Sequence, residues 1–395
     1  MSGTHSQIGL LTAGRDRPYA LGLAAALTAA DVRFDFVGSD EVDSPELHTS
    51  PQIRFLNLRG DQSVDAGLVK KILRVLAYYF RLLGYAIAAK PKVFHILWNN
   101  KFELFDRTAL MLFYKLLGKK IVFTAHNVNA GARDANDSWF NRATLKFQYR
   151  RCDHIFLHTE KMKAELVAGY GIPESNASVI PFGINSTVPN TALTTAQARQ
   201  QLGLDESEKV LLFFGNIAAY KGVEFLVDAF IEVAQREENY RLIIAGRPKG
   251  SEEYWAGVLA KINASPVREK IILRIEFVPD AETEFFFKAA DALVLPYTHV
   301  FQSGVLFLGY NFGLPVLAAD VGSLKDEIIE GRNGFVFREK DAGALAKAIE
   351  GYFSSDLFKH LEQRRQEIKA FANERYSWTE VATITKQVYT KLLEN

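Results

Sequence analysis

Residues 301–322, FQSGVLFLGYNFGLPVLAADVG, decide how the rest of the chain can be interpreted. Small polar residues precede an apolar segment, Gly313 and Pro315 stop that segment, and a short apolar run then leads into Gly322. This order predicts a helix that begins at the Gln-Ser-Gly turn, followed by a buried strand.

A helix that begins at this turn can bind an anion. The backbone N–H groups near Ser303, Gly304 and Val305 have no intrahelical partners, and the positive end of the helix dipole points at whatever lies in front of them. Gly304 lets an anion approach the backbone closely because it has no side chain. On this stretch alone two interpretations stay open, a phosphate site and an N-cap serine on an ordinary helix.

The preceding segment favours the phosphate site. Residues 290–297, ADALVLPY, predict a buried strand that ends in Pro296-Tyr297. Ser303 therefore follows the carboxyl end of a strand, which is where ligands bind in open α/β sheets.

Four short pieces of the sequence resemble the family 4 glycosyltransferases of the GT-B fold, in their order and spacing over nearly the whole length. They are YKG at 220–222, AD at 290–291 with PY at 296–297, GLPV at 313–316 and IPFGI at 180–184. The resemblance implies an α/β protein of two Rossmann-like domains, whose parallel sheets face each other across a cleft. It also implies a C-terminal helix that crosses back to the first domain. We expect an acceptor domain at 1–185, a nucleotide-sugar domain at 186–375 and the crossing helix at 376–395.

Bulk properties agree with a two-domain globular protein. A chain of 395 residues is too long for one ordinary core, and the single cysteine, Cys152, excludes a disulfide framework. The first residues lack the pattern of a signal peptide, and no uncharged run is long enough to span a bilayer. We therefore expect a cytoplasmic protein, either free or bound peripherally at the inner face of the membrane.

The amino-terminal half contains a basic, very apolar segment. Residues 1–185 hold 23 Lys and Arg against 17 Asp and Glu, a net charge of +6. Residues 64–89 predict one long helix that carries four of these cations. Such a helix can lie in a membrane interface, or it can pack against the sheet with a basic outer edge. Both readings stay open.

Two residues of the first domain are candidates for the site. The predicted strand 119–125 delivers His126 at its carboxyl end, and an imidazole can exchange hydrogen bonds with a sugar hydroxyl. In the family a histidine after this strand sits beside the transferred sugar, so the resemblance implies a catalytic role for His126. Gly14, in the turn after the first strand, matches a glycine loop that faces the cleft.

The second domain supplies the other candidates. Lys221 matches the family's donor-binding lysine and can neutralise a diphosphate. It follows a loop that starts with Gly215 and Asn216, where members of the family commonly carry an arginine after the glycine. Arg247 is a candidate to compensate for that missing cation. Val278 lies in the turn where family members read the nucleobase with backbone groups.

A second departure concerns the Glu-x7-Glu pattern of the family, whose two positions are Val300 and Leu308 here. A variant subgroup carries Gln-Ser-Gly-Val instead of the first part of this motif, and the four residues Gln302, Ser303, Gly304 and Val305 fit it. The phosphate-binding amides survive this change because they belong to the backbone.

The loop at 130–138, AGARDANDS, is polar and predicts a lid or an acceptor contact. Asp134 and Asp137 stand there, but two acids in a turn-rich loop more often face solvent, and there is no convincing Asp-x-Asp motif. We expect neither a metal nor another cofactor, and we find no nucleic-acid module.

The hypothesis from the sequence is a retaining glycosyltransferase that moves a sugar from a nucleotide diphosphate sugar to a hydroxyl acceptor. The acceptor classes are a glycan, a lipid-linked saccharide and a small molecule, which suggests polysaccharide or glycoconjugate biosynthesis. Two rivals stay open. A sugar-nucleotide epimerase needs carboxylates in the cleft. A catalytically silent nucleotide-sugar-binding subunit agrees with the lost glutamates.

Overall fold

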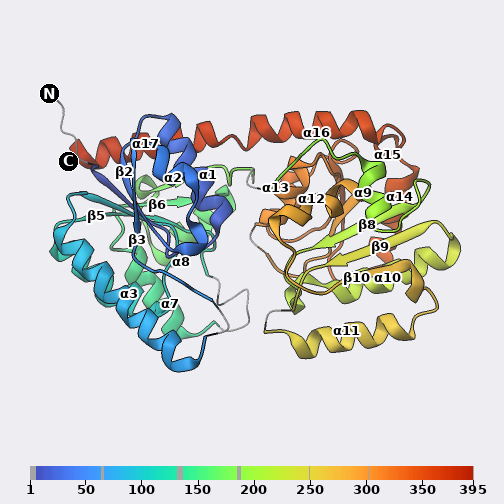
Figure 1. Cartoon of the computed structure of the whole chain (residues 1–395), viewed down its shortest axis with the longest axis horizontal. Coiled ribbons are helices and arrows are strands. Elements are labelled where there is room, and N and C mark those ends of the chain that lie inside the picture. Colours follow the sequence, from blue (N-terminus) through green and yellow to red (C-terminus); the bar gives the residue numbers. More distant parts are fainter. Residues whose placement is uncertain are drawn as a thin grey trace. The chain divides into compact units, whose positions relative to one another are not determined.

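The computed structural model describes residues 6–63, 66–129, 131, 137–184, 188–248, 250–300 and 302–394. The chain divides into two compact units (Figure 1). Unit 1 comprises Met1–Gly183 with Tyr376–Asn395, and unit 2 comprises Ile184–Arg375. Most of the predicted lid at 130–138, including Asp134, lies outside the described residues, as do residues 185–187 between the two expected domains.

Unit 1 is built on a parallel sheet of seven strands in the order β3-β2-β1-β4-β5-β6-β7. The strands are β1 Ile8–Leu11, β2 Phe34–Gly38, β3 Ile53–Asn57, β4 Val93–Ile96, β5 Lys120–Thr124, β6 His154–Leu157 and β7 Ala177–Val179. The helices are α1 Arg17–Ala29, α2 Pro45–Thr49, α3 Leu68–Ala88, α4 Glu103–Phe105, α5 Met111–Leu116, α7 Trp139–Tyr149, α8 Glu160–Tyr170 and α17 Trp378–Glu394, with a π-helical turn at Asp106–Leu110.

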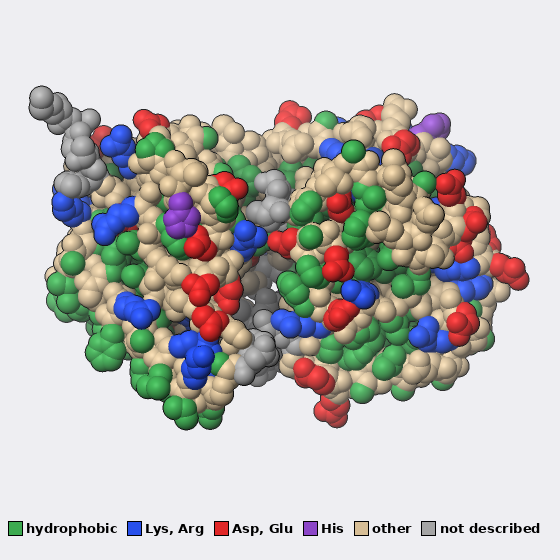
Figure 2. Space-filling view, viewed as in Figure 1, with side chains coloured by type: hydrophobic (Ala, Val, Ile, Leu, Met, Phe, Trp, Pro, Cys, Tyr) green, Lys and Arg blue, Asp and Glu red, His purple; other side chains and the backbone are tan. Residues whose placement is uncertain are grey.

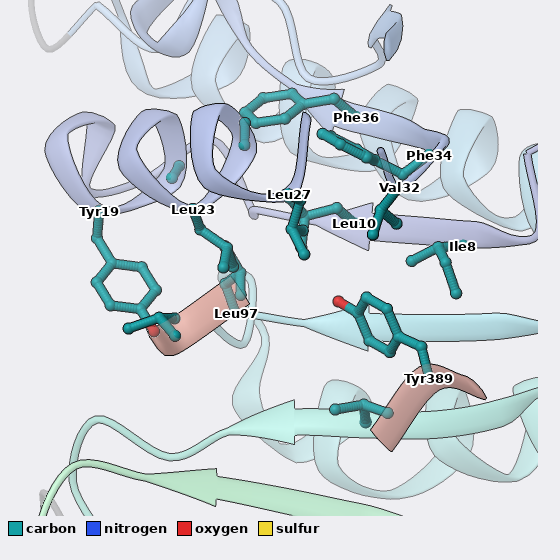
Figure 3. Packing of buried hydrophobic residues seen from close by; sticks show 14 of the residues in the cluster. Ile8, Leu10, Tyr19, Leu23, Leu27, Val32, Phe34, Phe36, Leu97 and Tyr389 are labelled. Carbon is teal, nitrogen blue, oxygen red and sulfur yellow. The ribbon is translucent and has the colours of Figure 1, made fainter. Parts of the chain in front are cut away.

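Successive side chains of β1 and its neighbours point to opposite faces of this sheet. Ile8 and Leu10 pack with α1 and with Tyr389 of α17 in one hydrophobic core (Figure 3). Gly9 faces the other way, where a side chain would meet the Tyr85 hydroxyl of α3 at 2.9 Å. The sheet is therefore covered on both faces, as its all-parallel strands require.

The C-terminal helix α17 belongs to the core of unit 1. It packs against α1, and the Trp378 ring fills the space beside two glycines, Gly22 and Gly183. A Cβ atom at Gly22 would lie 2.3 Å from that ring, so only glycine fits there. Residues far apart in the sequence thus complete one core.

Unit 2 is built on a parallel sheet of six strands in the order β10-β9-β8-β11-β12-β13. The strands are β8 Lys209–Phe214, β9 Tyr240–Ala245, β10 Ile271–Arg274, β11 Ala292–Leu295, β12 Val316–Ala319 and β13 Gly334–Phe337. The helices are α9 Thr195–Gln201, α10 Val223–Arg236, α11 Glu252–Ala264, α12 Asp280–Ala289, α13 Gly304–Asn311, α14 Ala342–Ser354, α15 Asp356–Lys359 and α16 Leu361–Arg375. These two sheets confirm the predicted α/β fold class.

A buried ion pair fixes the amino ends of the central strands of unit 2. Arg199 of α9 donates to both carboxylate oxygens of Asp291, at 2.9 and 2.8 Å. Asp291 also accepts the backbone N–H of Val210 at 2.8 Å. The Ala-Asp piece at 290–291 therefore has a structural role in this chain, since Asp291 joins α9 to the amino ends of β8 and β11.

Several element boundaries differ from those predicted. The long helix of unit 1, predicted over residues 64–89, spans Leu68–Ala88 in the structure. The predicted strands at 119–125 and 290–297 are shorter in the structure, because β5 spans Lys120–Thr124 and β11 spans Ala292–Leu295. Across the described parts of the chain, no helix combines the length and apolar character that crossing a bilayer requires.

Replacing Asp291 by Ala should destabilise unit 2, because it leaves the Arg199 guanidinium buried without its carboxylate. We expect a loss of about 3–5 kcal/mol in the free energy of unfolding, measured by denaturant titration. Asp228→Ala is the control, since it breaks the exposed pair with Lys261 and should cost less than about 1 kcal/mol. Equal losses in both variants would contradict the role of the buried pair.

Candidate functional site

The amino end of α13 follows the carboxyl end of β11, as the sequence predicts. Ser303 is the N-cap residue of this helix, but its side chain makes no capping hydrogen bond. Its hydroxyl lies instead 3.3 Å from the hydroxyl of Tyr297, the second residue after β11. The first turn is partly accessible, since Gly304 is exposed and Val305 is half-buried. An ordinary N-cap serine therefore does not describe this turn.

A chain of hydrogen bonds ties Lys221 to this turn. Lys221 ends the 3₁₀ turn Ala219–Lys221, and its ammonium donates to the Tyr297 hydroxyl at 2.6 Å. Burial raises the pKa of Tyr297, so its hydroxyl keeps its proton and can donate to Ser303. Sequence reasoning placed Lys221 and Ser303 but gave Tyr297 no role, although this residue closes the strand that precedes the helix.

Two glycines allow the loops after β8 and β9 to meet beside α13. A Cβ atom at Gly215 would lie 3.4 Å from the Val305 side chain, so this loop faces the first turn of the helix. Gly246 approaches Gly215 so closely that a Cβ atom would come within 1.9 Å of the Gly215 carbonyl oxygen. Its φ of +147° also favours glycine.

The remaining candidates of unit 2 differ in how closely they join this group. Arg247 follows Gly246, and its buried Nε has no hydrogen-bond partner in the structure. Asn216 follows Gly215 with an exposed side chain. Val278 is buried in the segment between β10 and α12. The structure thus brings Gly215, Arg247 and Val305 to one edge of the sheet.

The glutamates missing from positions 300 and 308 are replaced by apolar side chains that are buried, Val300 and Leu308. A carboxylate does lie near the amino end of α13, but it comes from another segment. Gln302 donates through Nε2 to Glu327 Oε1 at 3.4 Å, and the Gln302 Oε1 atom is buried without a partner. Nothing in the local pattern around Glu327 predicts this contact.

In unit 1, His126 lies in an aromatic setting directly after β5. Its ring stacks on the Trp98 ring with centroids 4.3 Å apart and planes at 3°, and Tyr19 meets it edge-on at 4.6 Å. Burial lowers the pKa of His126 well below its ordinary value, and the neighbouring His158 lowers it further, while the Leu97 backbone opposes the change. Its ring is therefore neutral at pH 7.

Hydrogen bonds define where the protons of the two rings lie. His158 Nδ1 lies 3.3 Å from the Ile180 carbonyl oxygen, which can only accept, so this nitrogen carries the proton. The other nitrogen of His158 then accepts from His126 Nδ1 at 3.0 Å. His126 Nε2 is left unprotonated, and this buried atom has no partner. It is an acceptor suited to a ligand hydroxyl.

Gly14 lies in a tight turn whose polar groups are largely used within unit 1. Its N–H donates to the Thr12 hydroxyl at 3.1 Å, and its carbonyl accepts from Gln62 Nε2 at 2.6 Å. Its φ of +63° favours glycine. A direct role of Gly14 in donor binding stays a prediction.

No group of three or more His, Cys, Asp or Glu side chains within the described ranges is arranged to hold a metal ion. That the protein needs no metal ion stays a prediction from the sequence. Asp137, one of the two acids considered there, accepts hydrogen bonds from Asn141 and Arg142 near the start of α7.

Two family models match successive parts of the chain. Residues 18–188 match the model described as Glycosyltransferase Family 4. Residues 208–355 match the model described as Glycosyl transferases group 1. Each match falls mainly within one of the two units.

Curated relatives cover only part of this chain. It is 27% identical over 249 residues to an uncharacterized glycosyltransferase, MJ1607, of Methanocaldococcus jannaschii, which covers 62% of each chain. It is 29% identical over 237 residues to D-inositol 3-phosphate glycosyltransferase of Pseudarthrobacter chlorophenolicus, covering 60% of this chain and 55% of the relative. The chain thus spans somewhat more than half of the length of these relatives.

Solved structures share the fold over nearly the whole chain. Sucrose-phosphate synthase of Thermosynechococcus elongatus has a TM-score of 0.77 at 18% identity, covering 99% of this chain and 100% of that one. HepE of Anabaena, in complex with UDP and glucose, has a TM-score of 0.74 at 17% identity, with the same coverage. These similarities confirm the GT-B fold.

The tautomers of the two histidines can be measured without any ligand. In long-range ¹H–¹⁵N spectra of the ¹⁵N-histidine-labelled protein at pH 7, both His126 and His158 should show the Nδ1–H tautomer. Their signals are assigned from His126→Gln and His158→Gln. His158→Gln removes the ring nitrogen that accepts the His126 Nδ1 proton, so His126 should no longer be restricted to the Nδ1–H tautomer.

The pH dependence gives a control for the same experiment. Burial lowers the pKa of His158 to about 4, so its ring should stay neutral until the pH falls to that range. An Nε2–H tautomer of His126 at pH 7 would contradict the deduced arrangement.

Proposed function

We propose that this chain, which carries a glycosyltransferase family 4 domain followed by a group 1 glycosyltransferase domain, transfers a sugar from a nucleoside diphosphate sugar to an acceptor hydroxyl. One observation carries the proposal. The amino end of α13 and the Lys221–Tyr297–Ser303 chain present N–H and ammonium donors at the carboxyl edge of the sheet. That is the chemistry a diphosphate leaving group requires.

The proposed mechanism stabilises charge on the leaving diphosphate. When the bond between the sugar and the diphosphate breaks, negative charge grows on the phosphate oxygens. The amides of Ser303, Gly304 and Val305 and the ammonium of Lys221 are preorganised donors for that charge, and such a donor can contribute about 3 kcal/mol. We extend the proposal to a reaction without a metal ion, because these groups supply the positive charge themselves.

We further propose retention of the anomeric configuration, with the leaving phosphate accepting the proton of the acceptor hydroxyl. Lys221 and His126 are poor covalent nucleophiles, because the Lys221 ammonium is buried in the chain to Tyr297 and the neutral His126 ring is stacked on Trp98. The support for a nucleoside diphosphate donor comes from the fold, since the similar protein HepE was solved with UDP and with UDP-glucose.

His126 has a separate role in this proposal. Its unprotonated Nε2 accepts a hydrogen bond from a hydroxyl of the transferred sugar, while the Trp98 and Tyr19 rings fix the plane of the imidazole. His126 is therefore a catalytic residue in the proposal, and His158 is a positioning residue. Gly215, Asn216, Arg247, Val278 and Gln302 are proposed to contact the donor.

We propose the three acceptor classes that the sequence suggests: a glycan, a lipid-linked saccharide or a small molecule. Polysaccharide or glycoconjugate biosynthesis would use each of these. An epimerase is not supported, because the positions where the family carries carboxylates are filled by buried Val300 and Leu308.

Donor hydrolysis separates a transferase from a catalytically silent binding protein. The chain is incubated with a panel of UDP-, GDP- and ADP-sugars without acceptor, and free nucleotide is measured. Slow release of one nucleoside diphosphate supports the transferase. Tight binding of a nucleotide sugar with no release, with or without a panel of sugar acceptors, would contradict it.

Replacing Lys221 by Ala should weaken binding of the nucleoside diphosphate that a thermal-shift panel of UDP, GDP and ADP selects. Removing a hydrogen bond to a charged group costs about 1.5–3 kcal/mol, which is roughly a 10- to 150-fold rise in the dissociation constant. Isothermal titration calorimetry measures this change.

Lys209→Ala is the matched control. Lys209 begins β8, the strand that precedes the Lys221 loop, and it lies at the end of the strand away from that loop, where it pairs with Glu237. Its dissociation constant should stay within about twofold of the wild-type value. Unchanged affinity in Lys221→Ala, with the fold retained, would remove this lysine from the donor site.

A further inference from the structure

The outer face of α3 is apolar along the whole length of the helix. Seven large apolar side chains of α3 are exposed by between 43% and 76%: Leu68, Val69, Ile72, Leu73, Leu76, Phe80 and Ile87. Val69, Leu73, Leu76, Phe80 and Ile87 recur at helical spacing and form one stripe. We call this stripe the α3 face. Figure 2 shows green side chains gathered over α3.

The opposite side of α3 holds the helix firmly in unit 1, so the α3 face does not belong to the core. Tyr78 donates to Asn100 Oδ1 at 2.6 Å, Tyr79 to Asp106 Oδ1 at 2.9 Å and Tyr85 to Asp35 Oδ2 at 3.0 Å. Turning the helix to bury the stripe would break all three hydrogen bonds.

The charges along α3 all have one sign. The segment Leu68–Ala88 contains Lys70, Lys71, Arg74 and Arg81 but no Asp or Glu. Arg74 pairs with Asp61 at 2.6 Å, which compensates part of its charge. Glu103, which stands between the exposed Phe102 and Leu104, pairs with Arg107. A helix with an apolar stripe flanked only by cations is the pattern of segments that lie on an anionic bilayer.

The apolar surface continues beyond α3 through stacked rings. Tyr79 stacks on Phe102, with centroids 5.5 Å apart, and Phe102 is itself 46% exposed. Leu104 of α4 is also exposed. The amino-terminal half of α3 presents an open apolar surface of Leu68, Val69, Leu73 and Ala77, with Lys70 and Arg74 beside them.

We propose that the α3 face docks on the surface of an anionic lipid bilayer. Its apolar side chains enter the boundary between headgroups and acyl chains, while Lys70, Lys71 and Arg81 stay at the headgroups. The charge pattern favours this occupant over a second copy of the chain, because two such faces in contact would bring cations of the same sign together. The docking goes beyond the proposed glycosyl transfer and does not depend on it.

The test is sedimentation of the full chain with sucrose-loaded vesicles. One set contains phosphatidylcholine only. The other contains phosphatidylcholine with about 30 mol% phosphatidylglycerol, which is anionic. We expect at least about tenfold stronger partitioning onto the anionic vesicles at low salt, falling as salt is raised. Equal binding to both sets, or none to either, would overturn the proposal.

Two double variants separate the apolar and the charged contributions. Leu73→Ser with Phe80→Ser, and Lys70→Glu with Lys71→Glu, should each lower partitioning at least about tenfold. The controls are Phe277→Ser with Ile329→Ser, which are exposed apolar residues of unit 2, and Lys347→Glu with Lys359→Glu, which reverse two exposed lysines of unit 2. Both controls should bind vesicles like the wild type, and losses equal to those of the α3 variants would contradict a localised face.

A reporter on the face distinguishes lipid contact from self-association. Phe80→Trp places an indole on the stripe, and its emission should shift to shorter wavelength with anionic vesicles and not with dilution. Sedimentation velocity without lipid should give the same species for wild type and for the Leu73→Ser, Phe80→Ser variant. A wild-type dimer that this variant converts to a monomer, with vesicle binding unchanged, would assign the face to a second copy and overturn the proposal.

Discussion

The hydrogen bond between the Lys221 ammonium and the Tyr297 hydroxyl is the constraint on which the site of unit 2 depends. A buried ammonium is stable only if it is hydrogen-bonded, and Lys221 is almost fully buried. Through Tyr297 the bond reaches Ser303. It therefore joins the loop after β8, the end of β11 and the first turn of α13. The glycines Gly215 and Gly246 let the neighbouring loops close around the same point, and the α13 amides and the ammonium become one donor surface.

Unit 1 uses a related device at the end of β5. There the group held in place is an acceptor, His126 Nε2. It carries no proton because the hydrogen bonds to His158 and the Ile180 carbonyl place the His126 proton on Nδ1. Buried polar atoms without partners are rare in folded proteins. Several of those found here, His126 Nε2, Arg247 Nε and Gln302 Oε1, occur at or beside residues chosen from the sequence as site candidates. Within each unit, these donors and acceptors are thus held in place before any ligand binds, and the cost of ordering them on binding is avoided.

Much of this could be predicted from the sequence because it depends on local signals. Gly313 and Pro315 mark the end of α13, buried apolar runs mark the strands, and His126 and Ser303 both lie in segments beyond the carboxyl ends of strands. The contacts that define the chemistry could not be predicted in this way. Tyr297 is 76 residues from Lys221, and His158 is 32 residues from His126, so no periodicity links them. Asp291 shows the converse, since a residue quoted for its resemblance to a family turns out to hold Arg199 in the core. The exposed stripe of α3 was equally hidden, because an apolar helix sequence does not say which of its faces the sheet covers.

The central claim is that the α13 amides and the Lys221 ammonium bind a diphosphate. The most direct test is a crystal structure of the protein with UDP, or with the nucleoside diphosphate that the thermal-shift panel selects. We expect phosphate oxygens within hydrogen-bond distance of the Ser303, Gly304 or Val305 amides and of the Lys221 ammonium or the Ser303 hydroxyl. A nucleotide bound with its phosphates away from that turn would contradict it.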